Sequence, residues 1–233
     1  VLRAGMIAKA NGSAYLERDK IKIICAVHGP RQRTAASGAS AAASATGGGS
    51  TTYAPVATVT CEFKYAPFAR NRRQGYVRDN NERHLGTLVA DALRPAIQTA
   101  LYPKAEISLF LTILEEDGEL ATLAAAMLCA SSALGDAGIP CFDLVSAACL
   151  IYLPNAPTAS QICIDPSASD EEAAVGEQVG LVVAWMPSRQ QTTLVHIEGQ
   201  FASTKLAQEL LQVATKQADL GSAIMRKALL EDV

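Results

Sequence analysis

Runs of apolar residues, some continuous and some alternating with polar ones, divide the chain into predicted strands. Lys20-Ile21-Lys22-Ile23 alternates polar and apolar side chains, as a strand does when one of its faces is buried. The stretch 106–114 is almost wholly apolar and rich in branched and aromatic residues, which is typical of a buried strand. On these patterns we predict strands over residues 2–10, 13–17, 21–27, 56–65, 106–114, 144–153, 161–164, 179–186 and 194–197.

Apolar residues spaced three and four apart predict helices between and after these strands. The first helix spans 85–101, with cap candidates at 79–81. Pro95 predicts a kink or the local loss of one backbone hydrogen bond, because proline lacks a backbone donor. The last helix begins at Ser203 or Thr204. Its predicted buried stripe consists of Leu206, Leu210, Val213, Gln217, Leu220 and Ile224.

A third helix, over 120–134, follows the turn signal Asp117-Gly118 and is rich in alanine. We expect its larger apolar residues to form one face, and its alanines to let it lie close against a sheet. The strand at 106–114, this helix and the strand at 144–153 are predicted to form a βαβ-like unit.

Strands followed by an amphipathic helix occur twice, in 1–101 and in 102–233. This order predicts an α/β (α+β) fold of mixed sheets with helices packed on them, in two pseudo-repeated halves that form one domain over 1–233. Residues 34–52 contain only Thr, Ala, Ser and Gly. Such a segment buries too little to offset its ordering entropy, so we expect a flexible surface insertion.

Composition limits the classes of partner and of site. The net charge is −3, so any contact with nucleic acid has to be local. No apolar run approaches the ~18 residues that cross a membrane, no secretory leader is visible, and the start at Val1 suggests that residues precede it.

Cysteine and histidine are placed as in a protein without a metal site. The cysteines form no C-x-x-C pair, and most lie in apolar runs, which predicts buried free thiols in a reducing compartment. The three histidines have no ligand at metal-binding spacing, so we expect no metal and no cofactor. The cysteines are Cys25, Cys61, Cys129, Cys141, Cys149 and Cys163, and the histidines are His28, His84 and His196.

A basic loop interrupts this acidic chain between two predicted elements. Its arginines are Arg70, Arg72, Arg73, Arg78 and Arg83. They can pair with acidic neighbours in a solvated loop, or they can contact RNA phosphates, and both readings stay open. Tyr76 is a further candidate, for stacking on a base.

Several motifs resemble the ribonuclease PH superfamily over nearly the whole chain. They are Gly12-Ser13-Ala14-Tyr15-Leu16-Glu17, Gly29-Pro30-Arg31, Ala66-Pro67-Phe68, Leu134-Gly135-Asp136-Ala137-Gly138-Ile139-Pro140 and Asp143-Leu144-Val145. The resemblance implies a ribonuclease PH-like fold. Within the superfamily the chain is most similar to ring subunits of the eukaryotic RNA exosome, in which the arginine loop lines the RNA path.

The chain departs from active members of the superfamily at two chemical positions. Active members hold the attacking phosphate with an arginine three residues after Asp-Gly, where this chain has Ala121, and Glu119 adds a carboxylate that repels phosphate. The resemblance places a catalytic acid at the position of Gly180, which carries no side chain to donate a proton. Glu177 is the nearest alternative acid, although the acidic run 170–177 reads more simply as a solvated loop.

Two functions from different classes follow from the resemblance. The first is a non-catalytic structural subunit of an exosome ring, which helps to form the channel that threads RNA for 3′-to-5′ processing and degradation. The second is a phosphorolytic 3′-to-5′ exoribonuclease whose site is shared with a partner. A small-molecule kinase or chaperone-like domain has little support, because no Walker-type phosphate loop is present.

The resemblance also implies the partners and the compartment. A ring subunit would assemble with other ribonuclease PH-like subunits in a hetero-hexamer, beneath S1/KH cap proteins. It would pass single-stranded RNA to a separate nuclease, in the nucleus, including the nucleolus, and in the cytoplasm.

Overall fold

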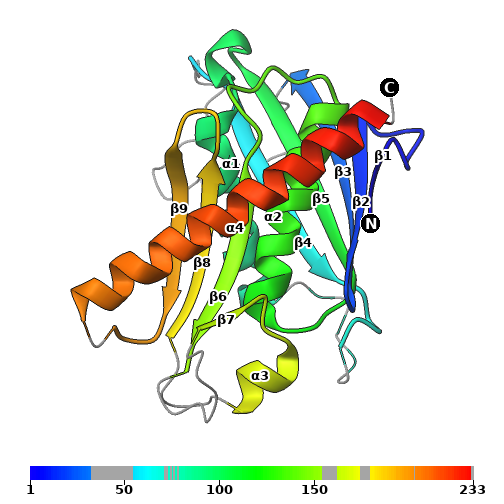
Figure 1. Cartoon of the computed structure of the whole chain (residues 1–233). Helices are drawn as coiled ribbons and strands as arrows, with labels where there is room; N and C mark the ends of the chain where they lie inside the picture. The colour runs from blue at the N-terminus through cyan, green and yellow to red at the C-terminus, as the bar shows by residue number, and fades with distance from the viewer. Residues whose placement is uncertain are drawn as a thin grey trace, which may run out of the picture.

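The computed structural model describes residues 1–32, 55–70, 73, 75, 77, 79–153, 162–173, 179–201 and 203–231. These residues form four layers: a sheet, a pair of helices, a second sheet and a long outer helix (Figure 1). This arrangement confirms the α/β class and the mixed sheets. The predicted insertion at 34–52 lies outside the described residues.

The first sheet has the order β1-β2-β3-β5-β4. β4 runs parallel to β5, and the other neighbours are antiparallel. Side chains along β3 and β5 alternate between buried and more exposed positions, because only one face of this sheet is covered. The strands are β1 (Leu2–Ala4), β2 (Gly12–Arg18), β3 (Ile21–Gln32), β4 (Thr58–Tyr65) and β5 (Ala105–Glu115).

The predicted first strand, 2–10, is too long. The strand ends at Ala4, because Gly5 takes a positive φ of 69° and turns the chain. The Ser13 hydroxyl then accepts a hydrogen bond from the Ile7 backbone N–H at 2.8 Å, which holds the turn against β2. The apolar residues after Gly5 therefore do not continue the strand, because the glycine turns the chain.

The second sheet has the order β7-β6-β8-β9 and is antiparallel throughout. Its central strands β6 and β8 are buried at almost every position, because helices cover both faces of the sheet. The strands are β6 (Ser146–Tyr152), β7 (Ile162–Ile164), β8 (Val179–Met186) and β9 (Gln191–Glu198).

Helix α2 (Glu119–Asp136) lies between the two sheets and contacts β2 and β3 on one side and β6 and β8 on the other. Every residue from Leu120 to Leu134 is buried. The expectation of a single apolar face is therefore wrong, whereas the expected close approach of the alanines is confirmed on both sides. The βαβ prediction is also wrong, because β5 and β6 belong to different sheets.

Helix α1 (Asn80–Leu93) packs beside α2 and covers β4. Asp79 is its N-cap, and Glu82 completes a capping box, which confirms the predicted cap. The α-helix ends before Pro95 and continues as two 3-10 turns, η3 (Arg94–Ala96) and η4 (Thr99–Leu101). Pro95 therefore ends the predicted 85–101 helix instead of kinking it.

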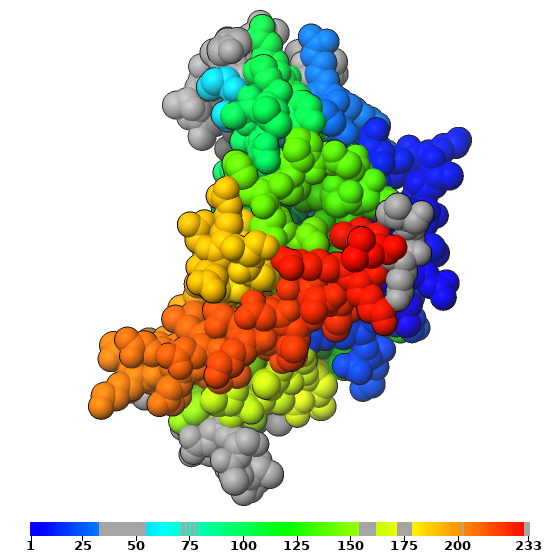
Figure 2. Space-filling view, turned by 45° about the horizontal axis from the view of Figure 1, so that its top comes forward, coloured from blue at the N-terminus to red at the C-terminus, as the bar shows by residue number. Residues whose placement is uncertain are grey.

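Helix α4 (Thr204–Glu231) crosses the outer face of the second sheet, as the space-filling view also shows (Figures 1 and 2). The Ser203 hydroxyl accepts a hydrogen bond from the Lys205 N–H at 3.3 Å, so Ser203 caps it. The predicted stripe is wrong at Leu220 and Ile224, each of which is 62% exposed. The prediction is confirmed at Leu210, which is buried, and the other buried side chains are Ala214, Ala218, Ser222 and Met225.

The remaining helix, α3 (Ala168–Ala173), is a short one after β7. Within the described part of the chain, no helix is long and apolar enough to cross a membrane. All six cysteines are free, and three of them, Cys25, Cys129 and Cys149, are fully buried. Burial raises the pKa of the Cys129 thiol to about 12, so this thiol is kept protonated.

Candidate functional site

The N-terminus of α2, where the resemblance places phosphate chemistry, is already occupied by a carboxylate of the chain itself. Glu171 of α3 accepts hydrogen bonds from the backbone N–H groups of Glu119 at 2.9 Å and Leu120 at 3.3 Å. The N–H groups at a helix N-terminus are the donors that bind an anion. An internal anion, the Glu171 carboxylate, therefore binds these two N–H groups.

Burial raises the pKa of Glu171, and the two N–H donors partly offset this effect.

A second carboxylate fixes α3 in place, since Asp117 accepts a hydrogen bond from the Ala168 N–H at 3.0 Å. The prediction of a solvated acidic loop is therefore wrong for Glu171. The alternative acid Glu177 lies outside the described residues.

Arg70 is clamped beside this terminus. Its guanidinium donates to both carboxylate oxygens of Glu116, lies 3.5 Å from Glu119 and stacks 4.2 Å from the centroid of the Tyr65 ring. Burial lowers the pKa of Arg70, but the hydrogen bonds to Glu116, together with the charge interactions with Tyr65, Glu116 and Glu119, outweigh it and raise the pKa above its usual value. This arginine pairs with acidic neighbours, as one of the two readings of the loop expected.

Glu119 has partners of its own, because the Asn81 side-chain amide donates to it at 2.7 Å. The carboxylate that departs from the active pattern is thus held by Asn81 and Arg70. It places a further negative charge next to the occupied helix terminus, which opposes the binding of phosphate.

The position predicted to have lost a catalytic acid is closed by packing. Gly180 on β8 faces α2, and a Cβ atom built there would lie 2.3 Å from Cδ1 of Leu120. Leu120 is 3% exposed, so it fills the space that a carboxylate at position 180 would need. Leu120 can pack against β8 at this point because position 180 has no side chain.

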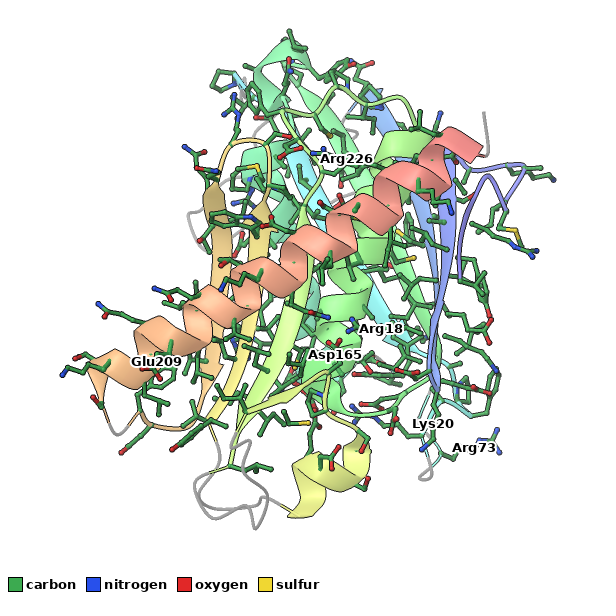
Figure 3. The ribbon with its side chains drawn as sticks, in the orientation of Figure 1. Arg18, Lys20, Arg73, Asp165, Glu209 and Arg226 are labelled. Carbon is green, nitrogen blue, oxygen red and sulfur yellow. The ribbon has the colours of Figure 1, made fainter. Side chains whose placement is uncertain are left out.

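Ala121 lines a small cavity of about 150 Å³ next to the same terminus. Arg18 and Asp165 form an ion pair in its wall and point toward each other in Figure 3. Asp19, Asp117 and Ser167 also line it, so its carboxylates outnumber its cation. Among the described residues, no group of three or more His, Cys, Asp or Glu side chains is placed to hold a metal ion.

The other predicted RNA-binding residues do not gather at one described place. Arg73 lines an open hollow of about 470 Å³ together with Pro67, Phe68 and Arg70. Arg83 is exposed on the first turn of α1. Arg72, Tyr76 and Arg78 lie outside the described residues.

Sequence reasoning missed Phe68 as a candidate, although its side chain is 71% exposed. A signal was available, since a large aromatic residue lay between proline and alanine at the start of an arginine-rich loop.

Comparison with known proteins identifies the family. The profile described as "3' exoribonuclease family, domain 1" of ribonuclease PH matches residues 1–140. The chain belongs to the ribonuclease PH family. Rice Rrp46 shares the ribonuclease PH fold, with a TM-score of 0.75 and 17% identity over 98% of this chain and 93% of that one.

Two similar relatives in the ribonuclease PH family carry the name exosome complex component MTR3. The Schizosaccharomyces pombe protein is 36% identical over 230 residues, covering 98% of this chain and 81% of the relative. The human protein is 38% identical over 185 residues, covering 79% of this chain and 65% of the relative. Exosome component Rrp41 of Pyrococcus horikoshii is 30% identical over 230 residues, covering 99% of this chain and 83% of that protein.

Proposed function

We propose that this chain is a non-catalytic structural subunit of an RNA exosome ring, of the MTR3 kind. Similarity to two exosome components named MTR3, at 36% and 38% identity, supports the assignment to an exosome. The chain's part is to form a wall of the channel through which RNA passes during 3′-to-5′ processing and degradation.

The observation that carries the non-catalytic role is the Glu171 carboxylate on the N–H groups of Glu119 and Leu120. Phosphorolysis needs inorganic phosphate beside cationic and N–H groups, and oriented groups of this kind supply orders of magnitude in rate. Here the N–H groups are taken and Arg70 is neutralised by Glu116. Among the described residues, the cations nearest this terminus, Arg70 and Lys20, each face a carboxylate of the chain, on Glu116 and Asp117.

The proposal extends to partners and compartment. The neighbours are other ribonuclease PH-like subunits in a hetero-hexameric ring, and S1/KH cap proteins, single-stranded RNA and a separate nuclease complete the assembly. The expected compartments are the nucleus, the nucleolus and the cytoplasm. The homology to exosome components supports these assignments.

Phosphorolysis by reconstituted rings tests the non-catalytic role. Rings with this chain are incubated with single-stranded RNA, with and without phosphate, and nucleoside diphosphates are measured. We expect no release that depends on this chain. Release that is lost on Glu171→Gln or Glu177→Gln, with ring assembly intact, would contradict the proposal and favour the shared-site exoribonuclease.

Photocrosslinking of RNA to the assembled ring tests the channel role. Arg73→Glu and Arg83→Glu are expected to weaken crosslinking to this chain, and each is expected to lower the salt dependence of binding by about one unit of slope. Arg94→Glu is the matched control, because Arg94 is also exposed but lies at the far end of α1, paired with Asp91. Arg70 is a poor probe, since its loss leaves Glu116 unpaired. Equal crosslinking by all variants would show that Arg73 and Arg83 do not contact RNA in the channel.

A further inference from the structure

The turn after β4 holds the Phe68 side chain away from the protein. The Ala69 N–H donates to the Ala66 carbonyl at 2.9 Å, and the Ala66 N–H donates to the Ile113 carbonyl at 2.8 Å. Ala66 and Ala69 are each 7% exposed, whereas Phe68 between them is 71% exposed. Two buried alanines and Pro67 thus fix the backbone and present the aromatic ring to solvent.

Arg73 brings a positive charge to the hollow around this ring, whereas the charge of Arg70 is paired with Glu116. Among the described residues, the lining of this hollow is Pro67, Phe68, Arg70 and Arg73, none of which carries a carboxylate. The carboxylate partner of Arg70 is turned toward the protein, since the Glu116 side chain is 9% exposed. Arg73 makes no ion pair with any carboxylate in the described part of the chain. Figure 3 shows Arg73 projecting at the same end of the molecule as Lys20.

We propose that Phe68 is a stacking platform for a base of single-stranded RNA, with Arg73 placed for the neighbouring phosphate. An aromatic face beside arginine is the chemistry that binds single strands without sequence preference, because every base has a π-face. The inference rests on the proposed function only in that RNA reaches this chain. It adds the residue that binds the base.

The same surface suits a protein partner less well. A stable protein interface buries about 800 Å² on each side, around a largely apolar core. The hollow offers one large apolar side chain, and the rest of its lining is one proline and two arginines. A base needs only the single ring.

Tryptophan fluorescence of the full chain tests the stacking directly. The chain has one tryptophan, Trp185 on β8 of the second sheet, whose indole N–H donates to Asp219 on α4 at 2.9 Å. Phe68 lies in the turn after β4 of the first sheet. In Phe68→Trp, we expect oligouridylate to quench the emission. The wild-type chain, with Trp185 alone, gives the baseline and is expected not to respond.

Affinity for oligouridylate separates stacking from charge. Phe68→Leu is expected to weaken binding about tenfold without changing its salt dependence, whereas Phe68→Tyr is expected to retain it. Arg73→Gln is expected to lower the salt slope by about one. Equal binding by wild type and Phe68→Leu overturns the proposal, and so does an absence of quenching in Phe68→Trp.

Ring assembly distinguishes a protein contact from an RNA contact. If Phe68→Leu prevents assembly while oligouridylate binding is unchanged, Phe68 is a subunit contact and the stacking proposal is wrong. If the wild-type chain joins no ring, the proposed function fails, but the fluorescence titration of the full chain still decides whether Phe68 stacks.

Discussion

Helices α2 and α4 pack on opposite faces of the second sheet. α2 is buried on all sides, whereas α4 is buried on one side and exposed to solvent on the other. α2 is buried from Leu120 to Leu134, while α4 leaves Leu220 and Ile224 exposed. The difference arises from what lies beyond each helix, since α2 has the first sheet behind it and α4 has solvent. A helix between two sheets needs small side chains on all sides, which explains the alanine-rich sequence of α2.

Truncation of one large side chain on each helix is expected to give the largest contrast. Met127 of α2 is fully buried, and Met127→Ala is expected to lower the free energy of unfolding by about 2–5 kcal/mol because it leaves a cavity. Leu220→Ala on α4 is expected to change it by less than about 0.5 kcal/mol. Urea unfolding measures both, and similar losses would contradict the comparison.

Glycines at the two helix–sheet contacts sharpen the comparison. Gly180→Ala is expected to cost about 1–3 kcal/mol, because its Cβ would meet the buried Leu120 at 2.3 Å. In Gly221→Ala on α4, the added Cβ would meet the Ser146 hydroxyl closely, at 2.7 Å, and Leu128 at an ordinary contact distance of 3.5 Å, and the variant would gain helix propensity of up to about 1 kcal/mol.

Double variants give the control for each glycine. Adding Leu120→Ala to Gly180→Ala should recover part of the loss, and adding Ser146→Ala to Gly221→Ala should give a net gain in stability. Strict additivity in either pair, measured by thermal or urea unfolding, would show that the close contact is not the cause.

The caps of the two helices give the smallest effect and a pH dependence. Glu171→Ala and Ser203→Ala are each expected to cost about 1 kcal/mol. Because the folded pKa of Glu171 is raised, ionisation opposes folding. The free energy of unfolding of wild type, relative to Glu171→Gln, should therefore rise as the pH falls from the folded pKa of Glu171 to its lower unfolded pKa. The same difference should fall again as the pH is raised through the folded pKa. A Ser203→Ala difference should not vary with pH over this range.

Local signals predicted much of the fold. The alternation in β3, the cap at Asp79 and the glycine-led start of α2 each depend on a few neighbouring residues, and each was found. Failures occurred where distant parts of the chain decide the outcome. The stripe of α4 was misplaced at Leu220 and Ile224, because only the position of the sheet determines which side faces inward.

The motifs drew attention to two positions of the candidate site, but the groups that surround these positions are visible only in the structure. Ala121 and Gly180 were singled out from the motifs alone. Glu171 on the N–H of Glu119, and Leu120 against Gly180, join residues more than fifty positions apart. No spacing rule connects such pairs, so the carboxylate on α2 could only be recognised in three dimensions.

The burial of α2 on both sides also limits how the chain can be divided. The matched family profile ends at residue 140, just after α2 and before every strand of the second sheet. A fragment cut there would expose to water the side of α2 that the second sheet covers, which is uncharged from Leu120 to Leu134, and we expect it to aggregate when expressed alone. Co-expression with the 141–233 piece should restore a soluble pair, because each piece carries the missing cover of the other.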